Sequence, residues 1–430
     1  MNDEGHRSNS RGRKFAAMPT QELPAQDPIS FAERILAILD EGSFATTYKF
    51  ALLLAILDAC QENIGADGSL PETIPTWRLA EHVTELYWSQ TEPYHPPAPL
   101  EPVDIRQSHR GKRPKILTRI EKLRSKHDLV TPWDARTKRR DDWERLIRDV
   151  EWELIIHPIP RLQRASAGKE DRVLYDHDFT PPEREGRDRH QPLTKEEWRD
   201  RGEPRSIRLK PGVGEQLVRL GGLLRPVIQR HWLLEVQRMN QELGESLLEE
   251  FLFGSDRKPT AALRDGLAEI ARRKCFYCTR PLRRNWEVDH FIPWARHPDN
   301  GVHNLVAACR TCNNSKRSLL AAQEHLERWT ERTHDGGVRG DLSDLANQEG
   351  WEANADRTVA IVRSQYLWLP PSARLWKQAL SGSGTPELVE PPRPEALLAL
   401  LQGEPSPDRQ AHLPHVAERG ARRSDGPEGP

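Results

Sequence analysis

Apolar residues recur at helical spacing through the first part of the chain, between breaks rich in proline. The segments FAERILAILD, from residue 31, and TTYKFALLLAILDACQEN, from residue 46, both predict helices. The second is so apolar that we expect a central core helix, with Cys60 as a buried thiol. Thr76 is expected to cap a third helix. A fourth, over residues 114–127, has an apolar face formed by Ile116, Ile120 and Leu123.

Three segments in the middle of the chain alternate polar and apolar residues and are candidate strands. They cover residues 152–159, 172–179 and 206–210, and the first is expected to be buried on both faces. A polar connection, PPEREGRDRHQPLTKEEW, separates the last two. A long helical run then extends from residue 212 to 253, with Pro226 expected in the first turn of a helix.

Together these patterns predict an α+β fold that is predominantly helical, with helical N-terminal and middle regions that carry a small cysteine-containing module. The expected order is a disordered tail (1–28), a helical N-terminal domain with a basic patch (29–150), a mixed strand and helix region (151–260), the module (261–330), a helical element (331–380) and a mostly disordered tail (381–430) with one apolar island, EALLALLQ.

Four of the five cysteines form two C-x2-C pairs in the stretch CFYCTRPLRRNWEVDHFIPWARHPDNGVHNLVAACRTCNNSKR. Two such pairs supply the four thiolates of a tetrahedral structural zinc site, formed here by Cys275, Cys278, Cys309 and Cys312. The interval between the pairs is longer than in a simple zinc ribbon, so the intervening residues must leave the zinc site and return to it.

The residues between the cysteine pairs predict a small strand and helix unit. Trp286 to Ile292 alternates polar and apolar residues, which indicates a short strand that ends at Pro293. The piece NLVAAC is expected to pair with it as an antiparallel strand. The polar residues NNS at 313–315 are expected to cap a helix that continues through KRSLLAAQEHLERW.

These residues resemble the HNH endonucleases, the ββα-metal nucleases, in the subgroup with a four-cysteine zinc knuckle. The resemblance covers residues 273–320 and rests on the order C-x2-C, V-D-H-x-I-P, N-L and C-x2-C-N-x2-K. It implies that His290 is the general base and that Asp289 and Asn313 bind a catalytic divalent ion. It also implies that Asn304 accepts a hydrogen bond from His290 and orients it.

The resemblance implies a phosphodiester hydrolase acting on DNA, with Mg2+ or Mn2+ as the catalytic ion and zinc in a structural role. Oxygen ligands suit hard ions of this kind, and an imidazole can accept a proton near neutral pH. Lys316 and Arg317 are expected to contact phosphates, although two solvated helix charges would look the same. His297 and His303 are expected to be exposed loop histidines without a role.

The distribution of charge favours a polyanionic partner. The whole chain has a formal charge of −1, yet residues 271–320 hold ten Lys/Arg against three Asp/Glu. Residues 104–140 form a second basic patch, with thirteen Lys/Arg against four Asp/Glu. This second patch predicts either nucleic-acid binding or a solvated helix face packed on a neighbour.

Three functions are compatible with these features. The first is an HNH endonuclease, by analogy in restriction or phage defence. The second is a catalytically silent zinc module that binds nucleic acid. The third is a nuclease subunit licensed by a protein partner that docks on the N-terminal helical domain. No apolar run approaches a membrane span of ~20 residues, and zinc-spaced thiols fit a reducing cytoplasm.

Overall fold

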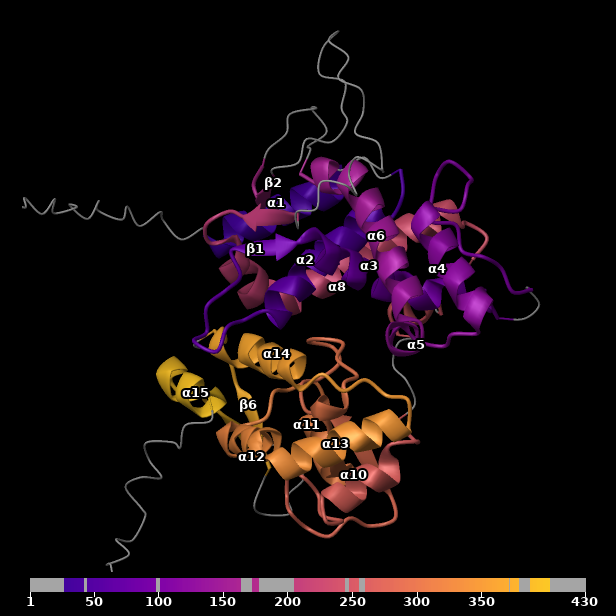
Figure 1. Ribbon diagram of the computed structural model, residues 1–430. Helices are drawn as coiled ribbons and strands as arrows, with labels where there is room; N and C mark the ends of the chain where they lie inside the picture. The colour runs from indigo at the N-terminus through magenta and orange to yellow at the C-terminus, as the bar shows by residue number, and fades with distance from the viewer. Residues whose placement is uncertain are drawn as a thin grey trace, which may run out of the picture.

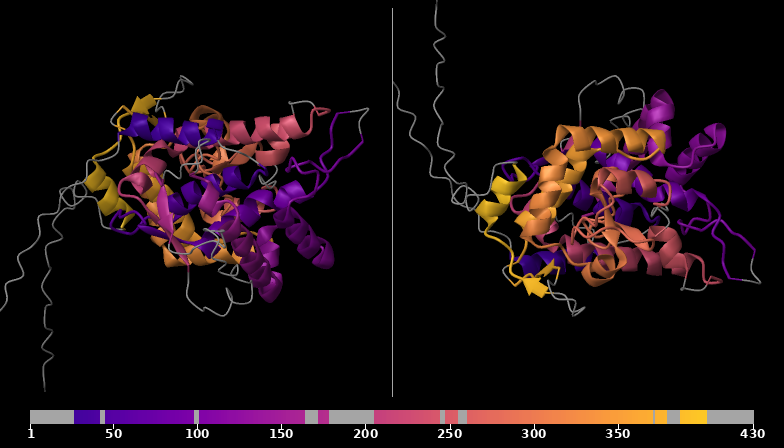
Figure 2. Two further views of the ribbon diagram at one scale, coloured as in Figure 1. Left: turned by 90° about the horizontal axis from the view of Figure 1, so that it is seen from above. Right: turned by 90° about the horizontal axis from the view of Figure 1, so that it is seen from below.

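The computed structural model describes residues 27–41, 45–97, 101–163, 172–177, 205–243, 247–254, 260–370, 372–378 and 387–402. Their elements form two lobes, an N-terminal lobe coloured indigo to magenta and a C-terminal lobe coloured orange to yellow (Figure 1). Seen from below, the orange helices lie in front of the N-terminal lobe (Figure 2). The predicted α+β, predominantly helical fold is confirmed.

The N-terminal lobe is a bundle of helices around α2, with one small sheet. Its elements are α1 (Pro28–Glu41), α2 (Tyr48–Glu62), β1 (Thr73–Pro75), α3 (Thr76–Trp88), η1 (Ser89–Thr91), α4 (Lys115–His127), α5 (Pro132–Lys138), α6 (Arg140–Ile156), η2 (Ile159–Arg161), β2 (Tyr175–His177), β3 (Ser206–Leu209), α8 (Val213–Met239) and α9 (Leu248–Phe253). The strands pair antiparallel in the order β1-β3-β2.

Helix α2 is the core helix that the sequence predicts, and it buries nearly every side chain, including Cys60. Helices α3, α8 and α14 pack around it. The approach of α8 is close, because a Cβ at Gly221 would lie 2.6 Å from the Gln61 amide nitrogen. Each Leu or Ile buried in this way stabilises the fold by about 1.5–3 kcal/mol.

Two predictions about the middle of the chain are wrong. Residues 152–156 belong to helix α6 and not to a strand, because the apolar side chains of α6 recur at helical spacing from Trp143 onward and the helix ends before Pro158. Pro226 lies inside α8 and not in a first turn. The helix continues past it because the apolar face on either side, from Leu217 to Trp232, is buried in the core.

The other predicted strands and helices can be compared directly. Residues 206–209 and part of 172–179 form β3 and β2 as predicted. The polar connection at 181–198 lies outside the described residues, as does the predicted N-terminal tail up to residue 26. Thr76 does not cap α3: it is the first residue of the helix, and its hydroxyl bonds the Glu151 carboxylate.

The C-terminal lobe contains the cysteine-rich module and the helices that cover it. Its elements are α10 (Arg264–Ile270), β4 (Trp286–His290), η3 (Val302–Asn304), β5 (Leu305–Cys309), α11 (Arg310–Lys316), α12 (Gln323–His334), α13 (Gly336–Gln348), α14 (Ala355–Leu367), β6 (Leu375–Lys377), β7 (Glu387–Val389) and α15 (Pro394–Leu401). Within the predicted C-terminal tail, the apolar island thus forms α15, which packs on α14 and α12.

The helix predicted to begin at Asn313 is divided differently. Helix α11 already begins at Arg310, directly after β5, and ends at Lys316. Arg317 has a φ of 51°, in the left-handed region, which ends the helix. The chain then runs through Leu320 to a separate helix, α12, so the second cysteine pair straddles the junction of β5 and α11.

Candidate functional site

The four cysteines of the module meet at one point. Their sulfur atoms all lie within 4.8 Å of one another. The Sγ atoms of Cys278 and Cys309 are 3.8 Å apart, and a tetrahedral site with Zn–S bonds of about 2.3 Å has S···S edges of about 3.8 Å. The cluster is therefore compatible with a structural zinc ion, as the spacing predicts.

Local backbone contacts shape this zinc knuckle before any metal binds. The amide of Cys275 donates to the Arg280 carbonyl at 2.9 Å, and Thr279 adopts a φ of 59° in the turn between them. The amide of Cys309 donates to the Cys275 sulfur at 3.3 Å. The Cys312 thiol donates to the Gln378 side chain at 2.9 Å. The neighbouring Cys312 side chain and nearby backbone amides lower the pKa of the Cys275 thiol. A thiolate is the form that binds zinc.

A two-stranded hairpin carries the candidate catalytic residues. Strands β4 and β5 pair antiparallel, with Asp289 opposite Val306 and His290 opposite Leu305. Helix α11 follows β5 directly and packs on both strands. The order of two strands and one helix is the ββα arrangement that the resemblance implies, and it places Asp289 and His290 at the end of a strand.

His290 is buried and is held by two residues of the loop that follows it. Its Nε2 lies 3.0 Å from the Asn300 Oδ1, and its ring packs edge-on against Trp294, with centroids 5.6 Å apart. An amide oxygen only accepts, so the Nε2–H donates and the basic lone pair is on Nδ1. This tautomer is the one needed for a general base that acts through Nδ1.

Asn304 does not orient His290 through the hydrogen bond predicted for it. Its side chain is fully buried, its Oδ1 accepts from the Ile292 amide at 2.8 Å, and its Nδ2 donates to the carbonyls of Ile292 and Asp299. All three contacts fix the backbone of the loop that begins after His290. The structure therefore makes Asn300 the partner of the imidazole and Asn304 the brace of the loop.

Asp289 is held from one side by two buried donors. Tyr277 donates its hydroxyl to Oδ2 at 2.6 Å, and the Lys316 ammonium lies 3.0 Å from the same oxygen. Burial, with the neighbouring Asp289 charge, raises the pKa of Tyr277 well above its usual value, so the hydroxyl remains a donor. These contacts fix the carboxylate in one orientation.

Asn313 lies on the same side of the hairpin. Its Nδ2 donates to the Glu287 carboxylate at 2.6 Å, and Glu287 precedes Asp289 by two residues in β4. Side chains two apart share one face of a strand. Because a carboxylate accepts and does not donate, this contact fixes the amide with its oxygen turned away from Glu287. Asn313 can thus offer an oxygen ligand on the face that carries Asp289.

The predicted phosphate contact of Lys316 is not supported by the structure. Lys316 is 0% exposed, and besides its ion pair with Asp289 its Nζ donates to the His290 carbonyl at 2.8 Å. Burial lowers the pKa of Lys316, and the ion pair with Asp289 opposes that shift. Arg317, one residue later, is exposed.

Two histidines expected to be exposed are buried. His297 is 1% exposed and its Nε2 lies 3.2 Å from Glu62 of helix α2, so it joins the two lobes. His303 is 2% exposed, and burial lowers its pKa to about 4. Both side chains are therefore part of the packed interior, which the sequence of the loop alone does not indicate.

Three residues of the site were missed: Tyr277, Glu287 and Asn300. The alternation of β4 signals Glu287, because it must share a face with Asp289. Nothing in the local pattern signals Tyr277 or Asn300, since each reaches the site only through the folded positions of the knuckle and the loop.

The basic patch at residues 104–140 is largely paired within the N-terminal lobe. Arg113 lies 2.9 Å from Asp104, Arg136 lies 2.6 Å from Glu85, and Arg119 lies 3.2 Å from the buried Glu153. The apolar face of α4, formed by Ile116, Ile120 and Leu123, is buried as predicted. These pairings favour the interpretation of a solvated helix face packed on its neighbours.

Two models of known protein families match parts of the chain. A family model described as HNH endonuclease matches residues 275–319, which confirms the resemblance to that family. A second, described as a domain of unknown function (DUF8808), matches residues 29–252. No curated protein and no solved structure matches the chain. None of the helices that the structure describes has both the length and the apolar character of a membrane span.

The second match coincides with the N-terminal lobe from α1 to α9, and the first with the zinc knuckle, the β4–β5 hairpin and α11. Since residues 29–252 are more than half of the chain, the protein belongs to the DUF8808 family and carries an HNH endonuclease domain in its C-terminal lobe.

Proposed function

We propose that the protein is a metal-dependent endonuclease that hydrolyses phosphodiester bonds in DNA, with His290 as the general base. The observation that carries the proposal is the position of His290 at the end of β4, with its Nε2 held by Asn300 and with Asp289 next to it in the strand. The family match to HNH endonucleases supports the reaction class.

Each residue of the site would have one role in the hydrolysis. His290 accepts a proton from the attacking water at Nδ1, and Asn300 keeps the ring in the required tautomer. Asp289 and Asn313 offer oxygen ligands, which suit Mg2+ or Mn2+. A divalent ion bound there would stabilise negative charge on the phosphate and on the leaving oxygen. Tyr277, Lys316 and Glu287 hold the two ligands in place.

The contacts of Asp289 also motivate the alternative of a silent zinc module. Lys316 already balances the Asp289 charge, so a cation must bind beside an ammonium group. In an active enzyme, supercoiled plasmid is nicked with Mg2+, is not nicked with EDTA, and is not nicked by His290→Ala even though this variant still binds DNA. A silent module binds DNA and nicks it under none of these conditions.

Exposed apolar residues on the N-terminal lobe support a further proposal, a protein partner that licenses the nuclease. Ile29 is 70% exposed and Leu36 is 40% exposed on α1, and Leu223 is 57% exposed on α8, which packs against α1. Contiguous exposed apolar patches mark sites where proteins associate, and these residues lie on two helices that pack side by side. A pull-down tests this proposal by comparing the full wild-type chain with the double variant Ile29→Lys, Leu223→Lys. A partner captured equally by both would contradict docking on α1 and α8.

A pathway of restriction or phage defence is a proposal that follows from the nuclease class by analogy; the proposal of a cytoplasmic location rests instead on the zinc-spaced thiols. The test of the pathway is phage plating efficiency on cells that express the wild type or His290→Ala. Equal plating on the two strains would contradict a defence role.

A further inference from the structure

A cavity of about 400 Å³ lies between the two lobes. Helices α2 and α3 and residues 130–136 form one wall, and residues 294–300 and 351–357 form the other. This volume lies within the usual range of about 300–1,000 Å³ for ligand sites, which often form at domain interfaces. The DUF8808 region and the nuclease lobe therefore build this site together.

Aromatic rings line much of the cavity. They belong to Trp88, Trp133, Trp294 and Trp351. Two of them are fixed by hydrogen bonds from their indole nitrogens, Trp88 to the Val130 carbonyl at 2.9 Å and Trp351 to the Asn300 carbonyl at 2.6 Å. Flat and immobile indole rings are the surfaces on which unstacked nucleobases stack.

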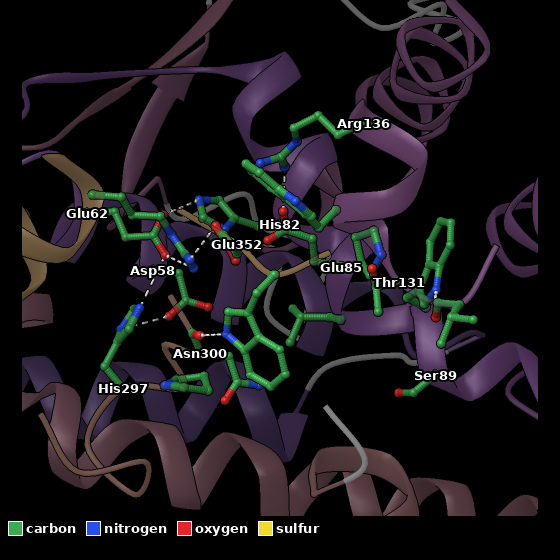
Figure 3. A pocket seen from close by; sticks show the side chains of 18 of the residues that line it. Asp58, Glu62, His82, Glu85, Ser89, Thr131, Arg136, His297, Asn300 and Glu352 are labelled. Atoms are coloured by element: carbon green, nitrogen blue, oxygen red, sulfur yellow. Dashed lines mark hydrogen bonds and ion pairs between the residues drawn. The ribbon is translucent and has the colours of Figure 1, made fainter. Parts of the chain in front are cut away.

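Carboxylates supply the hydrogen-bonding groups of the cavity. Figure 3 shows Asp58, Glu62, His82, His297 and Glu352 gathered at one end, with Ser89 and Thr131 at the opposite end. The two arginines that reach the cavity are already paired. Arg136 pairs with Glu85 at 2.6 Å, and Arg357 pairs with Glu62 at 2.8 Å. The cavity lining has five carboxylates, on Asp58, Glu62, Glu85, Glu92 and Glu352, against these two arginines. Its net negative charge favours a ligand that donates hydrogen bonds and disfavours a phosphate.

His82 adds a second, independent sign of a missing ligand. It is 5% exposed, and its Nε2 has no hydrogen-bond partner among the described residues, although a Glu62 oxygen lies 3.5 Å away. Buried polar groups are rarely left unsatisfied. The imidazole lines the cavity, so a ligand there could supply the partner.

The cavity touches the catalytic histidine through two of its lining residues. Trp294 packs against the His290 ring, and Asn300 holds the His290 Nε2 at 3.0 Å. A ligand that contacts Trp294 is therefore only one residue away from the proposed general base. The cavity contacts the imidazole on its Nε2 side, so a base bound there would belong to a nucleotide near the cleaved bond and not to the reacting phosphate itself.

We propose that the cavity binds one nucleobase with an exocyclic amino group, turned out of the DNA stack next to the cleaved bond. The indole rings stack on the base, and the carboxylates accept its amino protons, as acidic side chains do for cytosine. Thymine, which has no amino group, binds less well. The proposal rests on the nuclease function proposed above.

Binding of labelled single-stranded oligonucleotides to the full chain, measured by fluorescence anisotropy in EDTA, tests this site. Oligo-dC and oligo-dA should bind about tenfold more tightly than oligo-dT, the discrimination of one base contact. Glu85→Met should remove most of this preference and leave the affinity for oligo-dT unchanged. Trp133→Ala should weaken binding of all three oligonucleotides by about tenfold, because it removes a stacking surface.

Matched controls separate the cavity from general effects. Glu81→Met removes the other α3 carboxylate near Arg136, which does not line the cavity, and should keep the base preference. Trp77→Ala removes an exposed indole of the same helix and should change nothing. Equal wild-type affinity for the three oligonucleotides, or loss of preference in Glu81→Met as well, would overturn the proposal.

Two further measurements show whether the bound base belongs to DNA or to a free nucleoside, and distinguish failure of this site from failure of the proposed nuclease function. If adenosine or cytidine quenches tryptophan emission in wild type but not in Trp133→Ala, while the oligonucleotides show no preference, the site binds a free nucleoside and the proposal for DNA is wrong. Plasmid cleavage is measured in parallel. Cleavage without base preference overturns this site alone, whereas absence of cleavage by the wild type overturns the nuclease function on which it rests.

Discussion

In the N-terminal lobe, α2 and its neighbours bury their side chains in one large apolar core, whereas the C-terminal lobe divides its described apolar residues among three smaller clusters. The C-terminal lobe also has buried polar groups, among them Asn304, Lys316 and His303, and the four thiols of the knuckle are part of its largest cluster or pack against it. The N-terminal lobe also buries polar pairs, such as Asp58 with Arg225, but its apolar core is one continuous cluster. We therefore expect this lobe to be stable through its core, and the module to need the zinc ion that its four thiols can bind.

Loss of zinc should have the largest effect, and only on the module. Structural zinc sites contribute about 10–16 kcal/mol in small domains, so Cys309→Ser should lose stoichiometric zinc and make residues 275–319 protease-sensitive, with the N-terminal lobe intact. Cys60→Ala, a buried thiol of α2, is the control and should keep its zinc. A Cys309→Ser variant with normal zinc content and proteolysis would contradict the four-thiolate site.

Replacing Lys316 tests the buried ion pair. Lys316→Met leaves Asp289 without its counter-ion, and breaking a buried pair costs about 3–5 kcal/mol. Thermal unfolding of the module should therefore shift strongly downward. Arg317→Met removes an exposed neighbouring charge, and its stability should change by no more than about 0.5 kcal/mol. Equal stability of the two variants would show that Lys316 is not buried as described.

A cavity made by substitution in α2 tests the apolar core of the N-terminal lobe. Leu53 is 0% exposed, so Leu53→Ala should cost the N-terminal lobe about 2–5 kcal/mol. Denaturant unfolding followed by far-UV circular dichroism measures this loss, while zinc content should be unchanged. If zinc were lost together with the lobe, the two regions would not be stabilised independently.

A smaller effect concerns acid stability. Burial lowers the pKa of His325, in α12, to about 3, so the native state binds fewer protons than the unfolded state between this value and the ordinary histidine pKa of about 6.5. Stability should therefore fall as the pH falls through that window. His325→Gln should reduce the slope of the unfolding free energy against pH, by the contribution of up to about one bound proton. His334→Gln changes an exposed residue of the same helix and should leave that slope unchanged. Equal slopes would contradict the prediction.

The features that could be predicted from the sequence are those set by short-range spacing. Two cysteines separated by two residues can bind one zinc ion from a single turn, so the spacing predicts the knuckle. The alternation from Trp286 onward predicts β4, the first strand of the hairpin. The run WELII at 152–156 was ambiguous, because a short run of this kind occurs both in helices and in strands. Only its packing, as part of α6, decides between them.

The details of the site depended on tertiary contacts instead. A lysine at the end of a helix usually faces solvent, but Lys316, the last residue of α11, is turned inward by Asp289 and the His290 carbonyl. The contact with the imidazole that the resemblance implies for Asn304 is made by Asn300 instead, because the loop turns Asn300, and not Asn304, toward the ring. No local pattern distinguishes these two amides.

The rate of plasmid cleavage as a function of Mn2+ concentration, measured for the wild type, Asn313→Ala and His290→Ala, tests the central claim most directly. Asn313→Ala should need more metal and then recover part of the wild-type rate, because it loses a proposed ligand, keeps the base and leaves the buried pair of Asp289 with Lys316 intact. His290→Ala should remain about 10²- to 10⁴-fold slower at every concentration, because metal does not replace a general base. Full recovery of His290→Ala with added Mn2+ would contradict the account.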